Sequence, residues 1–288
     1  MITLEPRTDL AVEKIENTDK QLKGIESTDY IAGSIKVTRT RITTQDACKR
    51  IGKPIGEYVT ADIPDISGST EEYGDISAAL ADEISFLLPK NFKTALVIGL
   101  GNRDITPDAL GPKTAESILA TRHITPETAR DIGLADLKSV AVLSPGVLGQ
   151  TGIEVGEIIL GISQRIQPDA VITVDALAAL NTSRLCRTVQ ISNTGITPGS
   201  GVGNSRFEIS SKTLGIPVIA IGIPTVVCAD AIAHELGTDI PTGSAMKNMI
   251  VTPSDIDAKI EHSARLLGFS VCRALQPQIS FETLYALT

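Results

Sequence analysis

Short apolar runs alternate with amphipathic segments along most of the chain, and this rhythm predicts an α/β protein. The runs TALVIGL, SVAVLSP, AVITVDAL, TVQIS and IPVIAIGIP predict strands. Apolar positions recur at helical spacing in DALGPKTAESILATR, IEVGEIILGISQRI and PSDIDAKIEHSARLLGFSVCRALQ. TVVCADAIAHEL predicts a further helix, with Thr225 as its N-cap. Alternating strands and helices favour a mostly parallel or mixed sheet flanked by helices on both faces.

The N-terminal third has a different pattern. Residues 30–43, YIAGSIKVTRTRIT, are β-branched with partial alternation and predict one strand, and GEYVTADIP predicts another. Between them TTQDACKRIG predicts a helix that ends at Gly52, and DISAALADEISFLLP predicts a second helix. Residues 1–27 are polar and indicate a short helix or an ordered arm. We therefore expect an N-terminal β-rich extension on a single α/β domain.

Composition narrows the class of protein. Aromatic residues make up 3% of the 288 residues, so aliphatic side chains must form the core. A net charge of -8 argues against nonspecific nucleic-acid binding, which needs a basic face. The four cysteines are far apart, which favours reduced thiols in a cytoplasmic protein. We expect no membrane span, because no apolar stretch reaches about 18 residues.

The stretch VIGLGNRDITPDALGP begins like a nucleotide-binding fingerprint. A dinucleotide fingerprint needs a third glycine where this chain has Asp104, so the Gly-x-Gly indicates a tight bend after a strand. Asp108 follows Pro107 and precedes a predicted helix. It is either an N-cap or first-turn acid that complements the helix dipole, or a carboxylate displayed at the sheet edge where α/β proteins bind ligands.

Asp175 closes the apolar part of AVITVDALAAL, where an unpaired acid is costly to bury. One interpretation is a carboxylate that caps the next turn. The other places it on the same sheet edge as Asp108. Two neighbouring carboxyls can share a proton, so that one acts as base and the other as acid. Such a pair could activate water against a peptide carbonyl.

Residues 192–208, SNTGITPGSGVGNSRFE, form a glycine-rich segment. It is either a surface loop or a binding loop whose backbone amides line a cleft. The candidates for a substrate cleft are Gly101, Asn102, Gly199, Gly201, Gly203 and Arg206. None of the three histidines forms a metal-binding pair, and the chain has no Walker motif or Gly-x-Ser-x-Gly elbow. We expect no metal and no cofactor.

Several blocks together resemble the germination protease family of spore endopeptidases. They are RTDLAVE, GKPIGEYVT, VIGLGNRDITPDALGP, SPGVLGQTGIE, PDAVITVDALAAL, ISNTGITPGSGVGN, LGIPVIAIGIPTVV and MIVTPSDID, and they span roughly residues 7–275. The resemblance implies a fold similar to hydrogenase-maturation peptidases. It also implies catalytic roles for Asp108 and Asp175. The implied substrates are small acid-soluble spore proteins, degraded during germination in the cytoplasm of the spore core, and the implied assembly is a homotetramer.

The resemblance further implies a zymogen that cleaves itself. Family processing sites resemble Thr/Ser, an acid, a bulky apolar residue, Ala, a variable residue and Glu, and residues 8–13, TDLAVE, fit that pattern. Cleavage would then separate Asp9 from Leu10, giving a pro-segment 1–9 and a peptidase domain 10–288. From the residues alone, RTDLAVE is also a helix start with Thr8 as N-cap. Basic partners for substrate acids are sought among Arg103, Lys113 and Arg206.

Three other functions are compatible with parts of the sequence. A metal-assisted peptidase of the hydrogenase-maturation type would bind metal and be inhibited by chelators. A noncatalytic binding module would hold a small protein with the glycine loop and leave it intact. A nucleotide-binding protein would be stabilised by NAD or ATP.

Overall fold

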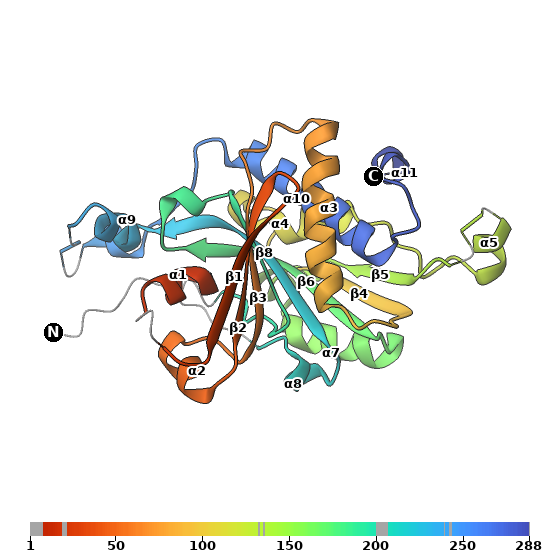
Figure 1. Ribbon diagram of the computed structural model, residues 1–288, viewed down its shortest axis with the longest axis horizontal. Coiled ribbons are helices and arrows are strands. Elements are labelled where there is room, and N and C mark those ends of the chain that lie inside the picture. The colour runs from red at the N-terminus through yellow and green to blue at the C-terminus, as the bar shows by residue number, and fades with distance from the viewer. Residues whose placement is uncertain are drawn as a thin grey trace.

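One mixed sheet organises the computed structural model, which describes residues 8–18, 22–131, 133–134, 136–199, 207–238, 240–241 and 244–287. Among these residues nine strands pair in the order β1-β2-β3-β7-β8-β6-β4-β5, with β9 added beside β8 (Figure 1). The strands are β1 Ile25–Ala32, β2 Ile35–Ile42, β3 Gly56–Asp62, β4 Thr94–Gly99, β5 Ser139–Leu143, β6 Ala170–Ala179, β7 Thr188–Ser192, β8 Val218–Cys228 and β9 Ile250–Val251.

The predicted α/β class and mixed sheet are confirmed. Strands β5, β4, β6 and β8 pair in parallel, as βαβ crossovers require. All other pairs are antiparallel, so the parallel character is confined to one half of the sheet. The β-rich extension is β1–β3, and its last strand pairs with β7, which makes it part of the same sheet.

Helices cover both faces of the sheet. On β4, Ala95 and Val97 pack with α3, α4 and α10, whereas the alternate residues Leu96 and Ile98 pack with α7 (Figure 1). The described helices are α1 Ala11–Glu16, α2 Gln45–Ile51, α3 Thr70–Leu87, α4 Leu110–Glu116, α5 Pro126–Asp131, α6 Leu148–Thr151, α7 Val155–Ile166, α8 Ser211–Leu214, α9 Ala229–Glu235, α10 Ile256–Leu275 and α11 Phe281–Leu287. Short 3-10 turns are η1 Thr106–Asp108, η2 Thr182–Arg184 and η4 Ala245–Asn248.

Local signals fix several element ends. Thr44 caps α2 by accepting a hydrogen bond from the Ala47 amide, and Gly52 ends that helix in the left-handed conformation, as predicted. The single strand expected over residues 30–43 is wrong. Gly33, with φ +57°, turns the chain back so that Ala32 pairs with Ile35 across a two-residue loop.

The N-cap predicted at Thr225 is also wrong, because β8 continues to Cys228 before α9 begins. Pro224 lies inside β8, and the pairing with β6 shifts register between Leu177 and Ala178 at that level. The shift accommodates a residue that has no amide to donate. The Thr225 hydroxyl instead donates to the Pro107 carbonyl at 2.7 Å, which ties the turn after β4 to β8.

No helix in the described part of the chain is both long enough and apolar enough to cross a membrane.

Candidate functional site

The bend after β4 positions Asp108. Gly101 adopts φ +114°, and a Cβ at this position would lie 2.1 Å from the Asp108 carbonyl oxygen. The predicted tight bend at the Gly-x-Gly is therefore confirmed. The Asp108 carboxylate folds back over the bend and accepts a hydrogen bond from the Asn102 amide at 2.7 Å.

Asp108 does not cap the helix that follows it. Helix α4 begins at Leu110 with Ala109 in the N-cap position, and no side-chain hydrogen bond caps this end of the helix. The N-cap interpretation of Asp108 is therefore wrong, and the carboxylate is held by the bend.

Replacing Gly101 by alanine is expected to lower the free energy of unfolding by about 2–4 kcal/mol, because the new Cβ combines backbone strain with a backbone clash. Urea unfolding measures the loss. Gly161 in α7 provides the matched control, because a Cβ there meets nothing within 4 Å. Gly161→Ala should be neutral or stabilising by up to about 1 kcal/mol. Equal unfolding midpoints for the two variants would contradict the close approach at Gly101.

Asp175 lies inside β6, four residues before its end, so the expectation that it ends the strand or caps a turn is wrong. Strand β4, however, stops at Gly99, which pairs with Val174. Asp175 therefore lies one residue past the carboxyl end of β4, the kind of edge where α/β proteins bind ligands. Its side chain is 5% exposed, and its Oδ1 accepts from the Ala176 amide at 2.9 Å.

The surroundings of Asp175 favour its protonated form. Burial, the nearby Asp108 and then Asp9 raise the pKa of the Asp175 carboxyl well above its ordinary value. Asp9, Asp108 and Asp175 line one cavity, so the fold brings the three acids to the same site.

A cavity of about 460 Å³ contains these acids. Among its lining residues are Gly101, Asp108, Asp175, Gly199 and Asp9. Asn102 contributes through its amide bond to Asp108. The predicted cleft residues Gly201, Gly203 and Arg206 fall outside the described residues.

The N-terminal segment enters this cavity and pairs with β6. The Asp9 amide donates to the Ala178 carbonyl at 2.9 Å, and the Ala178 amide donates to the Asp9 carboxylate at 2.9 Å. Leu10 is fully buried in a cluster with Leu177, Ala179 and Val227. The N-cap position of α1 is Leu10, so Thr8 is not the predicted cap.

The carbonyl of Asp9 receives two side-chain donors. Lys53 Nζ lies 2.6 Å from this oxygen and Gln190 Nε2 lies 3.1 Å from it. Gln190 Oε1 also accepts from the Ala11 amide at 2.6 Å, so one side chain holds the backbone on both sides of Leu10. Burial lowers the pKa of the Lys53 ammonium to about 8, with the Asp9 charge opposing this effect and Lys14 adding to it.

Sheet register explains why Gln190 lies near the acids. Gly222 on β8 pairs with Asp175 on one side and with Gln190 of β7 on the other. Residues in one such row project from the same face of a sheet. Asp9, Lys53 and Gln190 line a second cavity of about 790 Å³, so Asp9 borders both cavities.

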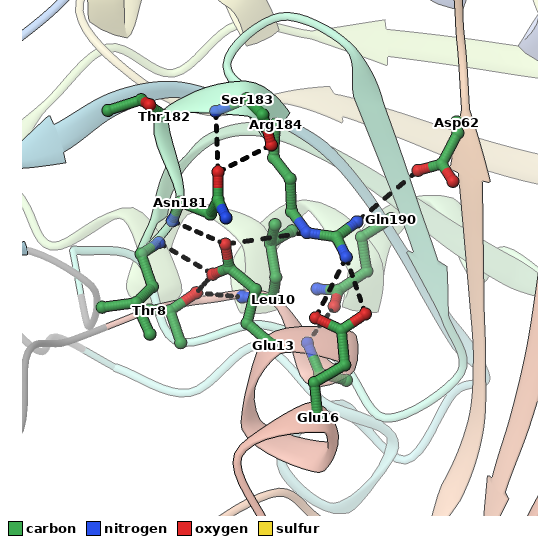
Figure 2. A network of polar contacts seen from close by, with 12 residues as sticks. Thr8, Leu10, Glu13, Glu16, Asp62, Asn181, Thr182, Ser183, Arg184 and Gln190 are labelled. Atoms are coloured by element: carbon green, nitrogen blue, oxygen red, sulfur yellow. Dashed lines mark hydrogen bonds and ion pairs between the residues drawn. The ribbon is translucent and has the colours of Figure 1, made fainter. Parts of the chain in front are cut away.

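Glu13 anchors the other end of the segment (Figure 2). Its carboxylate accepts from the Leu180 and Asn181 amides, each at 2.8 Å, and from the Thr8 hydroxyl. Arg184 Nε lies 3.8 Å from Glu13 Oε1. Glu13 is only 2% exposed, so its charge is enclosed by donors.

Sequence reasoning missed the basic residues that contact this segment. Of its candidates, Arg103 pairs with Glu116 and Lys113 with Glu261. Lys53 and Arg184 hold the segment instead. Lys53 lies in the quoted block GKPIGEYVT, which could have drawn attention to it, whereas Arg184 follows β6 in a stretch without a motif.

Within the residues that the structure describes, no group of three or more His, Cys, Asp or Glu side chains is arranged to hold a metal ion.

The chain is similar to germination proteases. The family model Peptidase_A25, germination protease, matches residues 4–240. A germination protease of Clostridium tetani is 40% identical, with 96% of this chain and 97% of that protein covered. One from Caldanaerobacter subterraneus subsp. tengcongensis is 39% identical, with 97% of each chain covered. The crystal structure of the [NiFe] hydrogenase maturation protease HycI from Thermococcus kodakarensis aligns with a TM-score of 0.41 and 19% identity, covering 67% of this chain and 98% of that one.

Proposed function

The chain belongs to the germination protease family, and on that premise we propose that it is an aspartate-dependent endopeptidase of spore germination. One observation carries the catalytic part of the proposal. The backbone of Asp9 pairs with β6 at Ala178, three residues after Asp175, and Asp9 lines the same cavity as Asp108 and Asp175. We infer that the Asp9–Leu10 peptide bond is the one that these carboxyl groups hydrolyse.

The two acids divide the proton transfers according to their surroundings. Asp175 keeps its proton, because its pKa is raised, and donates it to the leaving amine. Asp108 takes a proton from the attacking water. Lys53 and Gln190 donate to the carbonyl oxygen and stabilise the negative charge that develops there. Hydrolysis of the Asp9–Leu10 bond yields a carboxyl group on Asp9 and an amino group on Leu10.

The same geometry supports synthesis as a zymogen. Residues 1–9 would form the pro-segment and residues 10–288 the peptidase domain. While Asp9 lies between the two cavities, it blocks access to the acids. After its removal, the site would accept small acid-soluble spore proteins in the cytoplasm of the spore core. We further propose that the enzyme assembles as a homotetramer, needs no cofactor and makes no direct contact with nucleic acid.

Self-cleavage is tested by incubating the purified full-length chain at mildly acidic pH and sequencing its N-terminus. We expect a new terminus at Leu10. Full-length Asp175→Asn serves as the control and should keep its original terminus. An unchanged terminus in the unmodified chain, or cleavage at Leu10 in the control, would count against the proposal.

A further inference from the structure

The cavity that contains Asp108 and Asp175 extends well beyond these two acids. Its lining runs from β6, past the end of β4, to the connection between β5 and α7, which contributes residues 146–147 and 154–156. In the sheet, β4 separates β5 from β6, so the β5 side of the cavity lies away from the strand that pairs with Asp9. The cavity therefore has room on that side for another part of a substrate.

The residues that follow the Asp9–Leu10 bond do not use this room. Leu10 lies in an apolar cluster with Val227, and the Ala11 amide is held by Gln190 of β7. None of these four residues lines the cavity, and β7 lies on the opposite side of β6 from β5. The β5 side is therefore available to side chains that precede the cleaved bond.

A carboxylate on the β5 side has a buried oxygen without a partner. Glu154 is the N-cap residue of α7, and its carbonyl accepts from the Glu157 and Ile158 amides, but its side chain makes no capping hydrogen bond. The Oε2 atom of Glu154 is buried and has no hydrogen-bond partner among the described residues. A buried carboxylate oxygen without a donor is costly. Because Glu154 lines the cavity, a ligand there can supply the donor.

The charges around this cavity favour a cationic ligand. Its described lining includes four acids and no lysine, arginine or histidine. The acids are Asp9, Asp108, Glu154 and Asp175. The second cavity, which Asp9 also borders, has three lysines in its described lining. A cation is therefore attracted to the first cavity rather than to the second.

An aromatic ring and apolar side chains line the same cavity as Glu154. Phe207 covers Gly156, where an added Cβ would lie 2.2 Å from the Phe207 ring. Phe207, Val147 and Ile105 all belong to the lining. Lysine and arginine have apolar stems that pack on such surfaces, and their charged groups bind both carboxylates and aromatic faces. The combination suits a basic side chain better than a bare metal ion, which needs several oxygen ligands.

We infer that Glu154 and Phe207 form a subsite that binds a lysine or arginine side chain of the protein substrate, on a residue that precedes the cleaved bond. This inference rests on the proposed function. The ammonium or guanidinium donates to the Glu154 carboxylate, and the apolar stem packs against the Phe207 ring. Glu154 then determines specificity without touching the bond that is cleaved.

Cleavage of synthetic peptides tests the subsite. The peptide EPRTDLAVEKIENT copies residues 5–18, and Arg7 is its only basic residue ahead of the Asp9–Leu10 bond. A second peptide has methionine in place of Arg7, which keeps an apolar stem without a charge. Two more peptides add one arginine to the methionine peptide, at position 5 or at position 6.

The enzyme is full-length protein that has been allowed to process itself. We expect kcat/KM at the Asp–Leu bond to be about 10- to 100-fold higher for at least one of the three arginine peptides than for the methionine peptide. The difference should arise mainly through KM, since a charged hydrogen-bonded contact is gained in binding.

Variants of Glu154 separate recognition from general damage to the fold. Glu154→Gln should bring the best arginine peptide within about threefold of the methionine peptide. Glu154→Lys should prefer a peptide with glutamate at that position over the arginine peptide. Glu157→Gln is the matched control, because Glu157 is exposed in the first turn of the same helix and lines neither cavity. It removes the same charge and should keep the discrimination of the unmodified enzyme.

The outcomes distinguish the subsite from the peptidase activity. If no arginine peptide exceeds the methionine peptide by more than about twofold, the basic subsite is wrong while the peptidase assignment stands. If Glu154→Gln keeps the full discrimination, or if Glu157→Gln loses it equally, the assignment to Glu154 is overturned. If neither the peptides nor the Asp9–Leu10 bond of the full-length chain is cleaved, the proposed function fails and this inference fails with it.

Discussion

Asp175→Asn is expected to reduce peptidase activity by about 10²- to 10⁴-fold while leaving the protein folded. Asparagine is close to aspartic acid in shape, but it cannot donate a carboxyl proton to the leaving amine. Asp108→Asn should cause a loss of similar size, because the remaining acid lacks its partner. The measurement is kcat/KM on the peptide EPRTDLAVEKIENT, with protein whose circular dichroism matches that of the unmodified chain. To separate catalysis from processing, each variant is also assayed after the unmodified enzyme has removed its pro-segment, residues 1–9.

Asp175→Asn is expected to raise the stability of the fold although it lowers activity. Burial and the charges of Asp108 and Asp9 raise the pKa of Asp175, so the folded state binds this proton more tightly than the unfolded chain does. The fold therefore loses stability as pH rises from 3.8 through the raised pKa. Asparagine has no such penalty. Asp175→Asn should have a higher Tm than the unmodified full-length chain at neutral pH, and the difference should close as pH falls toward 3.8.

A variant that loses activity but gains stability indicates an acid kept in place for its chemistry. Full activity in both folded asparagine variants would overturn the catalytic assignment of Asp108 and Asp175. A lower Tm of Asp175→Asn at neutral pH would instead show that the carboxyl group supports the fold.

The two acids could be identified as candidates from sequence because each follows an apolar run, although the residues alone left a capping role open for both. An apolar strand that meets an acid is a local signal, and parallel strands bring their carboxyl ends to one edge. Local signals did not give the exact position of Asp175 in its strand. Strand β6 extends past Asp175 because β8 continues to pair with it, and that pairing depends on residues 47 or 48 positions away along the chain.

The groups that contact the N-terminal segment were not predictable in this way. Gln190 faces the site because the β7–β8 register places it opposite Gly222, and Lys53 reaches it from the connection before β3. Gln190 lies in the antiparallel half of the sheet and Lys53 in a connection that leads into it, and the alternation of strands and helices does not specify the pairing partners of this half. Arg184 depends on where the chain turns after β6. In each case the position is set by long-range register rather than by neighbouring residues.

The segment itself joins the two halves of the site. The acids come from the parallel half of the sheet, on β6 and the turn after β4, and the carbonyl donors come from the antiparallel half. Asp9 crosses between them, with its amide on β6 and its carbonyl on Lys53 and Gln190. We propose that a polypeptide bound across the sheet in this manner presents its peptide bond to the acids while Lys53 and Gln190 hold its carbonyl oxygen.

Lys53→Met is accordingly expected to lower kcat by about 10²- to 10³-fold, the usual cost of losing a donor to a developing oxyanion. Methionine has similar length and no charge, so packing is largely kept. Lys53→Arg, which retains a cationic donor, should keep more activity than Lys53→Met. Gln190→Glu should also reduce kcat, because a carboxylate cannot donate to the carbonyl. Lys90→Met is the control, since Lys90 is exposed and lies outside both cavities.

The pH dependence of activity distinguishes two roles of the Lys53 ammonium. It either takes part in catalysis or only holds the N-terminal segment in place. The pKa of Lys53 is lowered to about 8, so the charged form that donates most strongly is lost as pH rises through this value. The activity of the unmodified enzyme should fall across that range, and the residual activity of Lys53→Arg should lack this particular decline because a guanidinium stays charged. If Lys53 only held the N-terminal segment in place, Lys53→Met would change the rate of self-cleavage but would leave kcat for a separate peptide unchanged. That result would remove Lys53 from the reaction and leave Gln190 as the donor to the carbonyl.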